Sequence, residues 1–250
     1  MGGIAGAFSR VINSQIHIQK LKETVDIDDA DFVHEYSFSK SLKEHDVEIN
    51  SVNFKYRNSP EWIFDNLNLK IKKNSHTVIT GQNGSGKSTL LGLISGMLIH
   101  QNGSIKIGRD KLGYIGPTPL ILSTSLKENL LYGNTAVVDE SKILETCEMF
   151  KLFDVVNKEI LDRQVTNTSL SSGQMQKVGF IRAILSNVEI LLLDESTSNL
   201  DRNTKSLILD ILTNKNITVI NSTHDPTSFK QIDRHIQIDI VDNKRLIYDI

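Results

Sequence analysis

A glycine-rich segment in the first half of the chain has the residue types and the spacing of a phosphate-binding loop. Gly81, Gly86, Lys87 and Ser88 satisfy the pattern G-x-x-x-x-G-K-[ST]. Glycines let backbone N–H groups wrap phosphate oxygens, and a following helix N-terminus favours negative charge. We expect Lys87 to reach the outer phosphates and Ser88 to ligate Mg²⁺. The residues of this loop expected to bind a nucleoside triphosphate are Gly81, Gln82, Asn83, Gly84, Ser85, Gly86, Lys87, Ser88 and Thr89.

A second pair of chemical groups stands at the end of an apolar run. Residues 190–193 read Ile-Leu-Leu-Leu and are followed by Asp194 and Glu195, the profile of a parallel strand buried on both faces. A carboxylate at the end of such a strand can hold the water shell of Mg²⁺, so Asp194 is a candidate metal residue. Glu195 is a candidate general base for an attacking water. Acidic residues also simply terminate strands, and the glycine loop upstream is what favours the functional interpretation.

A third pattern is the pentapeptide Leu-Ser-Ser-Gly-Gln at positions 170–174, which stands before an apolar helical pattern. By itself it is adequately explained as a helix N-cap. Ser171 or Ser172 would then satisfy free backbone amides, and Gly173 would allow a tight entry into the helix. The pentapeptide therefore indicates a functional role only in combination with the other two motifs.

The segments that must position these groups alternate between strand and helix patterns. Residues 76–80 are β-prone, the glycine loop follows, and 90–98 have apolar residues at helical spacing. Residues 218–222 form another apolar strand pattern after a helical one at 207–212. This alternation predicts an α/β fold with a mainly parallel sheet. It also weakens the alternative that the glycine loop is a chance match in an ordinary turn.

The domain organisation is predicted from changes of pattern along the chain. Residues 1–46 contain a helical-looking stretch and an acidic run, and are expected to be an N-terminal helical extension and linker. From Val47 apolar residues alternate with polar ones, which predicts an N-terminal antiparallel β subdomain at the start of a domain over 47–250. Within it, about 118–185 is expected to be an inserted helical lobe.

Composition sets limits on function. The 250 residues are 39% hydrophobic and 23% charged, as in soluble globular proteins. A formal charge of −2 creates no general attraction for nucleic acid, so no nucleic-acid partner is expected. Cys147 is the only cysteine, which excludes an internal disulfide and fits a reducing compartment. No stretch approaches the roughly 18 apolar residues that span a bilayer.

The order of glycine loop, pentapeptide, Asp-Glu and a later histidine resembles the nucleotide-binding domain of ABC transporters, over about residues 47–248. On this resemblance the fold is a P-loop NTPase core, and the glycine loop is its Walker A motif. The pentapeptide is the signature motif, with Ser172 in place of a usual glycine. Residues 190–194 are the Walker B motif.

Three further residues take their expected roles from the same resemblance. Asp201 lies in a segment similar to the D-loop, and His224 looks like the switch histidine that contacts the γ-phosphate. Tyr56 resembles the aromatic residue that stacks on adenine. Without the resemblance, Tyr56 is ordinary packing on an edge strand and His224 is a structural or surface histidine.

The resemblance implies a head-to-tail homodimer with each ATP between Walker A of one subunit and the signature of the other. The cofactors implied are ATP and Mg²⁺. Glu195 is expected to be the general base, with His224 and Lys87 as further catalytic residues. The signature residues expected at the partner subunit's ATP are Ser171, Ser172, Gly173 and Gln174.

One position departs from the family pattern. Relatives carry, in a segment resembling residues 112–119, a glutamine that approaches Mg²⁺ and links the ATP site to the membrane domain, and here that position is Pro117. Proline has neither an amide donor nor a side-chain acceptor. We therefore expect nucleotide affinity to be retained, with slow or partner-dependent hydrolysis.

The segment before Val47 and the stretch 125–133 favour the C-terminal ATPase domain of an ABC exporter, which powers substrate export and works with a transmembrane domain of the same transporter. The fragment itself is expected to be soluble and to act at the cytoplasmic face of the plasma (inner) membrane. The alternatives are an ABC importer subunit, a non-transport ABC ATPase and an ATP-dependent regulatory module. The transported substrate cannot be inferred from these residues.

Overall fold

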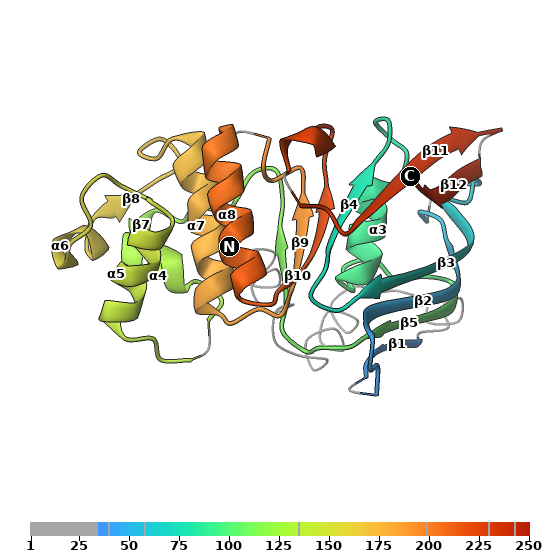
Figure 1. The fold of residues 1–250 in the computed structure, drawn as a ribbon, viewed down its shortest axis with the longest axis horizontal. Helices are drawn as coiled ribbons and strands as arrows, with labels where there is room; N and C mark the ends of the chain where they lie inside the picture. The colour runs from blue at the N-terminus through green and yellow to red at the C-terminus, as the bar shows by residue number, and fades with distance from the viewer. Residues whose placement is uncertain are drawn as a thin grey trace.

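The structure is a computed structural model that describes residues 35–39, 41–57, 59–134, 136–198, 200–229, 231–242 and 244–250. Its strands are β1 (Glu35–Phe38), β2 (His45–Phe54), β3 (Phe64–Lys72), β4 (His76–Thr80), β5 (Asn102–Ile107), β6 (Leu112–Ile115), β7 (Thr124–Ser125), β8 (Gln164–Val165), β9 (Ile190–Asp194), β10 (Thr218–Ser222), β11 (Arg234–Val241) and β12 (Lys244–Asp249). Its helices are α3 (Lys87–Ile94), α4 (Leu126–Leu131), α5 (Glu140–Met149), α6 (Lys158–Leu161), α7 (Ser172–Leu185), α8 (Arg202–Asn214) and the short 3₁₀ helix η2 (Pro226–Ser228). Figure 1 shows their arrangement.

The core is a six-stranded sheet in the order β12-β11-β4-β10-β9-β6. Its strands pair in parallel except for the antiparallel hairpin of β11 and β12. Every residue of β4, β9 and β10 is buried, as expected for strands covered on both faces. The predicted α/β class with a mainly parallel sheet is therefore confirmed.

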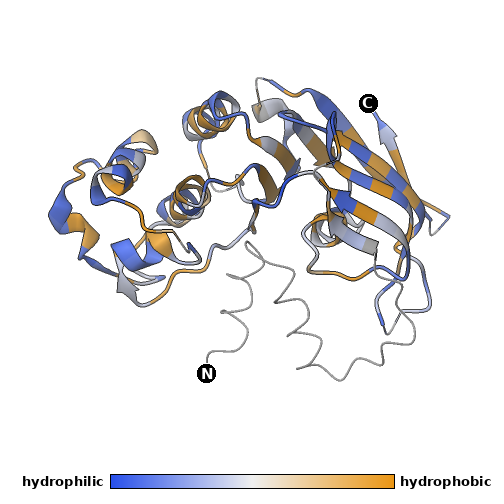
Figure 2. Ribbon diagram, turned by 90° about the horizontal axis from the view of Figure 1, so that it is seen from below, coloured by the Kyte–Doolittle hydropathy of each residue, from blue (hydrophilic) through white to orange (hydrophobic). Residues whose placement is uncertain are grey.

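Helices cover the two faces of this sheet differently. Leu191 and Leu193 belong to the apolar cluster that contains the buried residues of α7 and α8. Ile190 and Leu192 belong to the cluster that contains the buried apolar residues of α3. Figures 1 and 2 show α3 on one side of the sheet and α7 and α8 on the other. Because side chains alternate along a strand, Asp194 lies on the same face as Leu192. The sheet thus separates the helix after the glycine loop from the helix that carries the signature.

A second sheet, in the order β1-β5-β2-β3, forms the β subdomain. β2 pairs antiparallel with β3, as the alternating pattern predicted. β2 also pairs antiparallel with β5, a strand that was not predicted, and β1 pairs parallel with β5. β1 lies ahead of Val47, where the sequence placed the start of the domain. A four-residue edge strand is too short to show alternation. The helical stretch predicted within residues 1–34 lies outside the described residues.

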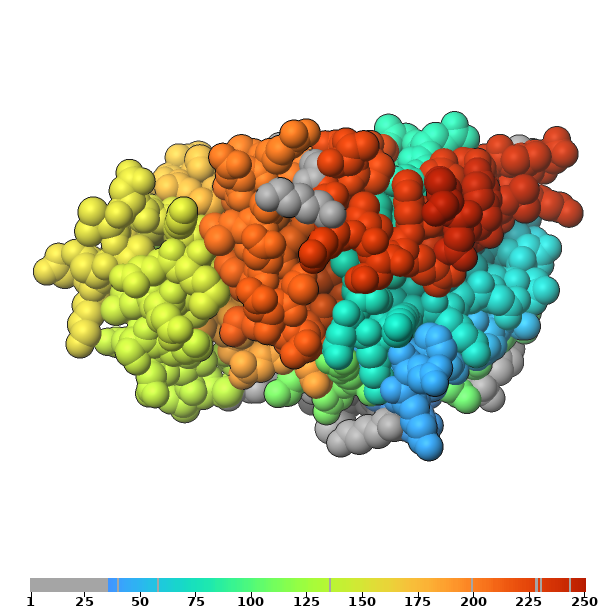
Figure 3. Space-filling view, viewed as in Figure 1, coloured from blue at the N-terminus to red at the C-terminus, as the bar shows by residue number. Residues whose placement is uncertain are grey.

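The region predicted as a helical lobe, 118–185, contains α4, α5, α6 and α7 together with a small β7–β8 pair that the sequence did not indicate. Phe150 and Phe180 stack in its core with ring centroids 6.4 Å apart. Cys147 is fully buried there, and burial raises the pKa of its thiol to about 12. In Figure 3, α8 lies between this lobe and the β11–β12 hairpin. Among the described residues, no helix combines the length and the apolar composition of a membrane span.

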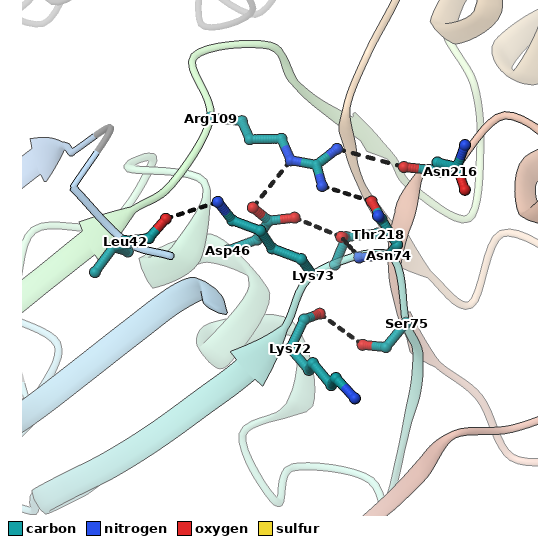
Figure 4. Close-up of polar contacts among 9 residues, drawn as sticks. All are labelled: Leu42, Asp46, Lys72, Lys73, Asn74, Ser75, Arg109, Asn216 and Thr218. Carbon is teal, nitrogen blue, oxygen red and sulfur yellow. Dashed lines mark hydrogen bonds and ion pairs between the residues drawn. The ribbon is translucent and has the colours of Figure 1, made fainter. Parts of the chain in front are cut away.

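A buried ion pair ties the two sheets together (Figure 4). The carboxylate of Asp46, on β2, is completely buried and accepts hydrogen bonds from Arg109 Nε at 3.0 Å and Thr218 Oγ1 at 2.5 Å. Arg109 also donates to Asn74 Oδ1 at 2.5 Å and to the carbonyl of Asn216 at 3.3 Å. The network therefore joins the β subdomain to β10 and to the turn that precedes β4.

Replacing Arg109 with Ala is expected to lower the free energy of unfolding by about 2 kcal/mol. The buried carboxylate of Asp46 loses its charged partner but keeps the Thr218 donor, which limits the loss. Urea unfolding followed by circular dichroism measures the change. The matched control is Lys142→Ala, because Lys142 pairs with the exposed Glu145 at 3.0 Å, where screening makes ion pairs weak. An equal or larger loss in the control contradicts the prediction.

Candidate nucleotide-binding site

The glycine loop joins the end of β4 to the start of α3, and its backbone requires glycine. Gly81, Gly84 and Gly86 have φ values of 149°, 79° and 106°, a backbone conformation that residues other than glycine rarely adopt. A Cβ atom on Gly81 would also lie 2.3 Å from the carbonyl oxygen of Ile238. The loop therefore turns tightly against β11 before entering α3.

Lys87 is the first residue of α3 and is only 5% exposed. Its ammonium group donates to the carbonyls of Gly81 at 2.9 Å and Gln82 at 3.2 Å. These hydrogen bonds hold the positive charge against the backbone of the glycine loop. Ser85 Oγ is buried with no hydrogen-bond partner among the described residues. A positive charge, an unpaired hydroxyl and a helix N-terminus at one loop suit an anionic ligand.

Ser88 and Asp194 meet at the same end of the sheet. The Ser88 hydroxyl donates to Asp194 Oδ1 at 3.0 Å, and Asp194 is 6% exposed. One hydroxyl and one carboxylate are hard oxygen ligands, and Mg²⁺ in nucleotide sites is bound by one or two such groups together with phosphate oxygens. The residues present therefore fit a magnesium ion carried in with a nucleotide.

Tyr114, on β6, is a contact of Asp194 that the sequence did not reveal. Its hydroxyl donates to Asp194 Oδ2 at 2.8 Å. Burial, and next the carboxylate of Asp194, raise the pKa of the Tyr114 phenol well above its ordinary value. The only sequence signal for this contact is the polar hydroxyl of Tyr114 within the otherwise apolar run 112–115.

Glu195 and His224 form a contacting pair just beyond the ends of β9 and β10. His224 Nε2 lies 2.8 Å from Glu195 Oε1, and the side chains of His224 and Glu195 are 51% and 36% exposed, so water reaches both. Glu195 has a φ of 51°, an uncommon conformation for a non-glycine residue that often marks a functional position. The backbone turn places the Glu195 carboxylate outside the buried strand and next to His224.

Tyr56 follows β2 and contacts the far end of the glycine motif. Its hydroxyl lies 2.9 Å from Thr89 Oγ1, and its ring packs edge-on against Phe54 with centroids 5.1 Å apart. Tyr56 is 45% exposed. An exposed aromatic ring beside a phosphate-binding loop is available to stack on a base.

The signature residues form a helix start. Ser171 is the N-cap of α7: its hydroxyl accepts from the Gln174 amide, and the Gln174 side chain accepts from the Ser171 amide. Ser171 and Ser172 are exposed, and Gly173 is half-buried. α7 and α3 lie on opposite faces of the sheet, and a role for these residues at the partner subunit's ATP stays a prediction.

Asp201 likewise begins a helix, as the N-cap of α8. Its carboxylate accepts from Thr204 N at 3.0 Å and from Thr204 Oγ1 at 2.6 Å. The Thr204 hydroxyl and amide hydrogen bonds lower the pKa of Asp201. The observed role is therefore helix capping, and the D-loop role stays a prediction.

Pro117 is exposed beyond β6, and its carbonyl is held by Gln176 of α7. Gln176 Nε2 donates to that carbonyl at 2.7 Å, and Gln176 is 1% exposed. This contact between Gln176 and Pro117 was not predicted from the sequence. A glutamine among the apolar residues of a helix is a feature that can indicate such a buried contact. The loop that contains Pro117 is thus attached to α7 through its backbone.

Together the glycine loop, the acid at the end of a buried parallel strand and the sheet order define a P-loop nucleotide-binding domain. The profile described as "ABC transporter" matches residues 64–198, more than half of the chain. The chain therefore belongs to the ABC transporter family, and the resemblance inferred from its motifs is confirmed.

Several curated relatives are clearly similar. "ABC transporter B family member 21" of Arabidopsis thaliana is 36% identical over 67% of this chain and 14% of its own length. "ATP-dependent permease MDL1" of Candida albicans is 33% identical over 76% of this chain and 31% of its own length. The chain thus spans less than a third of either relative.

A solved structure supports the fold. The chain described as a bacterial Atm1-family ABC exporter with ATP bound superposes with a TM-score of 0.73, at 21% identity. The match covers 92% of this chain and 43% of that one. At this identity the likeness establishes the P-loop NTPase fold and no residue's role.

Proposed function

We propose that this chain is the ATP-binding and ATP-hydrolysing domain of an ABC exporter. The observation that carries the proposal is the convergence of three groups at one end of the sheet: Lys87 across the glycine loop, Ser88 on Asp194, and Glu195 on His224. These supply, in order, a phosphate-binding cation, hard oxygen ligands and a candidate base.

The proposed reaction uses each of these groups. The phosphates of ATP lie in the glycine loop, and Lys87 exchanges its two carbonyl contacts for outer phosphate oxygens. Ser88 and Asp194 would hold a Mg²⁺ ion, which would neutralise charge on the phosphates. Glu195 accepts a proton from water as the water oxygen attacks the γ-phosphorus, the bond to the bridging oxygen breaks, and ADP leaves. His224, which contacts Glu195, holds the base and the water in place.

The proposed assembly is a homodimer with ATP between the two subunits. It is supported by the separation of α3 and α7 on opposite faces of the sheet. In the dimer the N-terminus of α7 meets the partner subunit's ATP, where the signature residues stabilise the γ-phosphate. Each site is complete only when a second copy supplies these residues.

The partner for transport is a transmembrane domain, with this chain at the cytoplasmic face of the membrane. Relatives named as an ATP-dependent permease and as a "Sophorolipid transporter" of Starmerella bombicola support a transport role. Those relatives extend well beyond the matched part, with 31% and 15% of their lengths covered. Substrate recognition belongs to segments outside the match, so no cargo is assigned.

Two measurements test the proposal on the purified chain: ATP hydrolysis with Mg²⁺, and sedimentation with and without ATP. We expect ATP binding, an ATP-dependent shift from monomer to dimer, and slow turnover because Pro117 cannot supply the family's glutamine. Absence of ATP binding would refute the proposal. Brisk turnover at low micromolar protein would refute only the expectation of slow hydrolysis.

Replacing Tyr56 with Ala is expected to weaken ATP binding about 10-fold, since an aromatic ring stacked on a base contributes roughly 1–3 kcal/mol. The control variant, Tyr56→Phe, keeps the ring and loses only the hydroxyl contact with Thr89, so its affinity should stay near wild type. Binding of a fluorescent ATP analogue measures both. If Phe and Ala weaken binding equally, the hydroxyl and not the ring is responsible.

A further inference from the structure

Tyr114 reaches the proposed metal site from a strand that carries none of the predicted site residues. β6 pairs in parallel with β9, and Tyr114 lies beside Leu192 in the register. Tyr114 and Leu192 pack against the same apolar cluster, on the α3 face. Asp194 is two residues beyond Leu192 and therefore lies on that face as well. The Tyr114 side chain extends along this face to the end of β9.

The two oxygens of the Asp194 carboxylate have different donors. Ser88 Oγ donates to Oδ1 at 3.0 Å, and Tyr114 Oη donates to Oδ2 at 2.8 Å. A hydroxyl that binds a cation does so through its oxygen, so the Ser88 contact must rearrange when an ion arrives. The Tyr114 contact need not change, because Oδ2 faces β6 and not the glycine loop.

We propose that Tyr114 is a positioning residue for Mg²⁺: its hydroxyl holds Oδ2 of Asp194, so that Oδ1 faces the ion next to Ser88. Tyr114 itself touches neither the ion nor the nucleotide. Partners of this kind orient a metal ligand, and their loss typically costs about 10- to 100-fold in metal affinity or activity. The inference rests on the proposed function, since it concerns an ion that arrives with ATP.

The test compares Tyr114→Phe with wild type in the 250-residue chain. ATP binding is measured with a fluorescent analogue, first in EDTA and then across a titration of free Mg²⁺. In EDTA the variant should bind as wild type does, because the glycine loop is intact. The free Mg²⁺ concentration that gives the half-maximal effect should rise about 10-fold. This readout does not depend on turnover.

Tyr36→Phe is the matched control. Tyr36 is a half-buried tyrosine whose hydroxyl donates to the carbonyl of Ile94 at 2.8 Å, at the other end of α3. Removing it deletes a comparable hydrogen bond with no link to Asp194, so the Mg²⁺ response should match wild type. A shift in Tyr36→Phe as large as that in Tyr114→Phe would overturn the inference.

Two further results of comparing Tyr114→Phe with wild type would also contradict the positioning role of Tyr114. An unchanged Mg²⁺ response in Tyr114→Phe overturns the inference while leaving the proposed function intact. Equal weakening with EDTA and with Mg²⁺ overturns it as well, because it shows a general structural role. Failure of the wild-type chain to bind ATP under either condition refutes the proposed function itself.

Discussion

ATP turnover should fall about 100- to 10,000-fold when Glu195 is replaced with Gln, the range typical of a lost general base. Gln keeps the size of the side chain and can still contact His224, but it cannot accept a proton from water. ATP binding is unaffected, so the ATP-bound dimer should accumulate. Phosphate release measures the rate, and sedimentation with ATP measures the dimer.

Glu148→Gln is the control for this experiment. Glu148 is exposed on α5, in the helical lobe, and its replacement makes the same change of charge away from the site. Its turnover should match wild type. Unchanged hydrolysis in Glu195→Gln would exclude Glu195 as the general base. The uncommon positive φ of Glu195 would then have another cause.

Nucleotide affinity should fall about 100-fold when Lys87 is replaced with Met. The Met side chain fills the buried position, but the ammonium group that would bind phosphate oxygens is gone, and hydrogen bonds to charged groups contribute about 1.5–3 kcal/mol each. Binding of a fluorescent ATP analogue without Mg²⁺ isolates this effect from the metal. Thermal unfolding without nucleotide checks that the fold is retained.

Lys106→Met serves as its control, because Lys106 is exposed on β5 and carries the same charge. It should bind ATP like wild type. If Lys87→Met also binds like wild type, the contacts of Lys87 with the carbonyls of Gly81 and Gln82 are its whole role, and the loop holds phosphates through backbone amides alone.

The strand, loop and helix around Gly81 to Thr89 were predictable because they are contiguous. The loop's chemistry depends on residues a few positions apart, and its flanks carry the periodicity of a strand and a helix. The same holds for Asp194, at the end of a continuous apolar run. Alternation predicted β2 and β3 for a similar local reason, whereas β1 and the β7–β8 pair were too short to show a period.

The family, the mainly parallel α/β fold and the residue types that would bind a nucleotide could all be inferred from motifs and periodicity. Three contacts could not be inferred in this way: Tyr114 with Asp194, Gln176 with the Pro117 carbonyl, and Arg109 with Asp46. These contacts join residues that are far apart in the chain. Each depends on strand register and on which face of a strand or helix a side chain occupies, and a shift of one residue reverses that face. Local periodicity does not fix the pairing between distant strands, because parallel strands are joined through intervening helices.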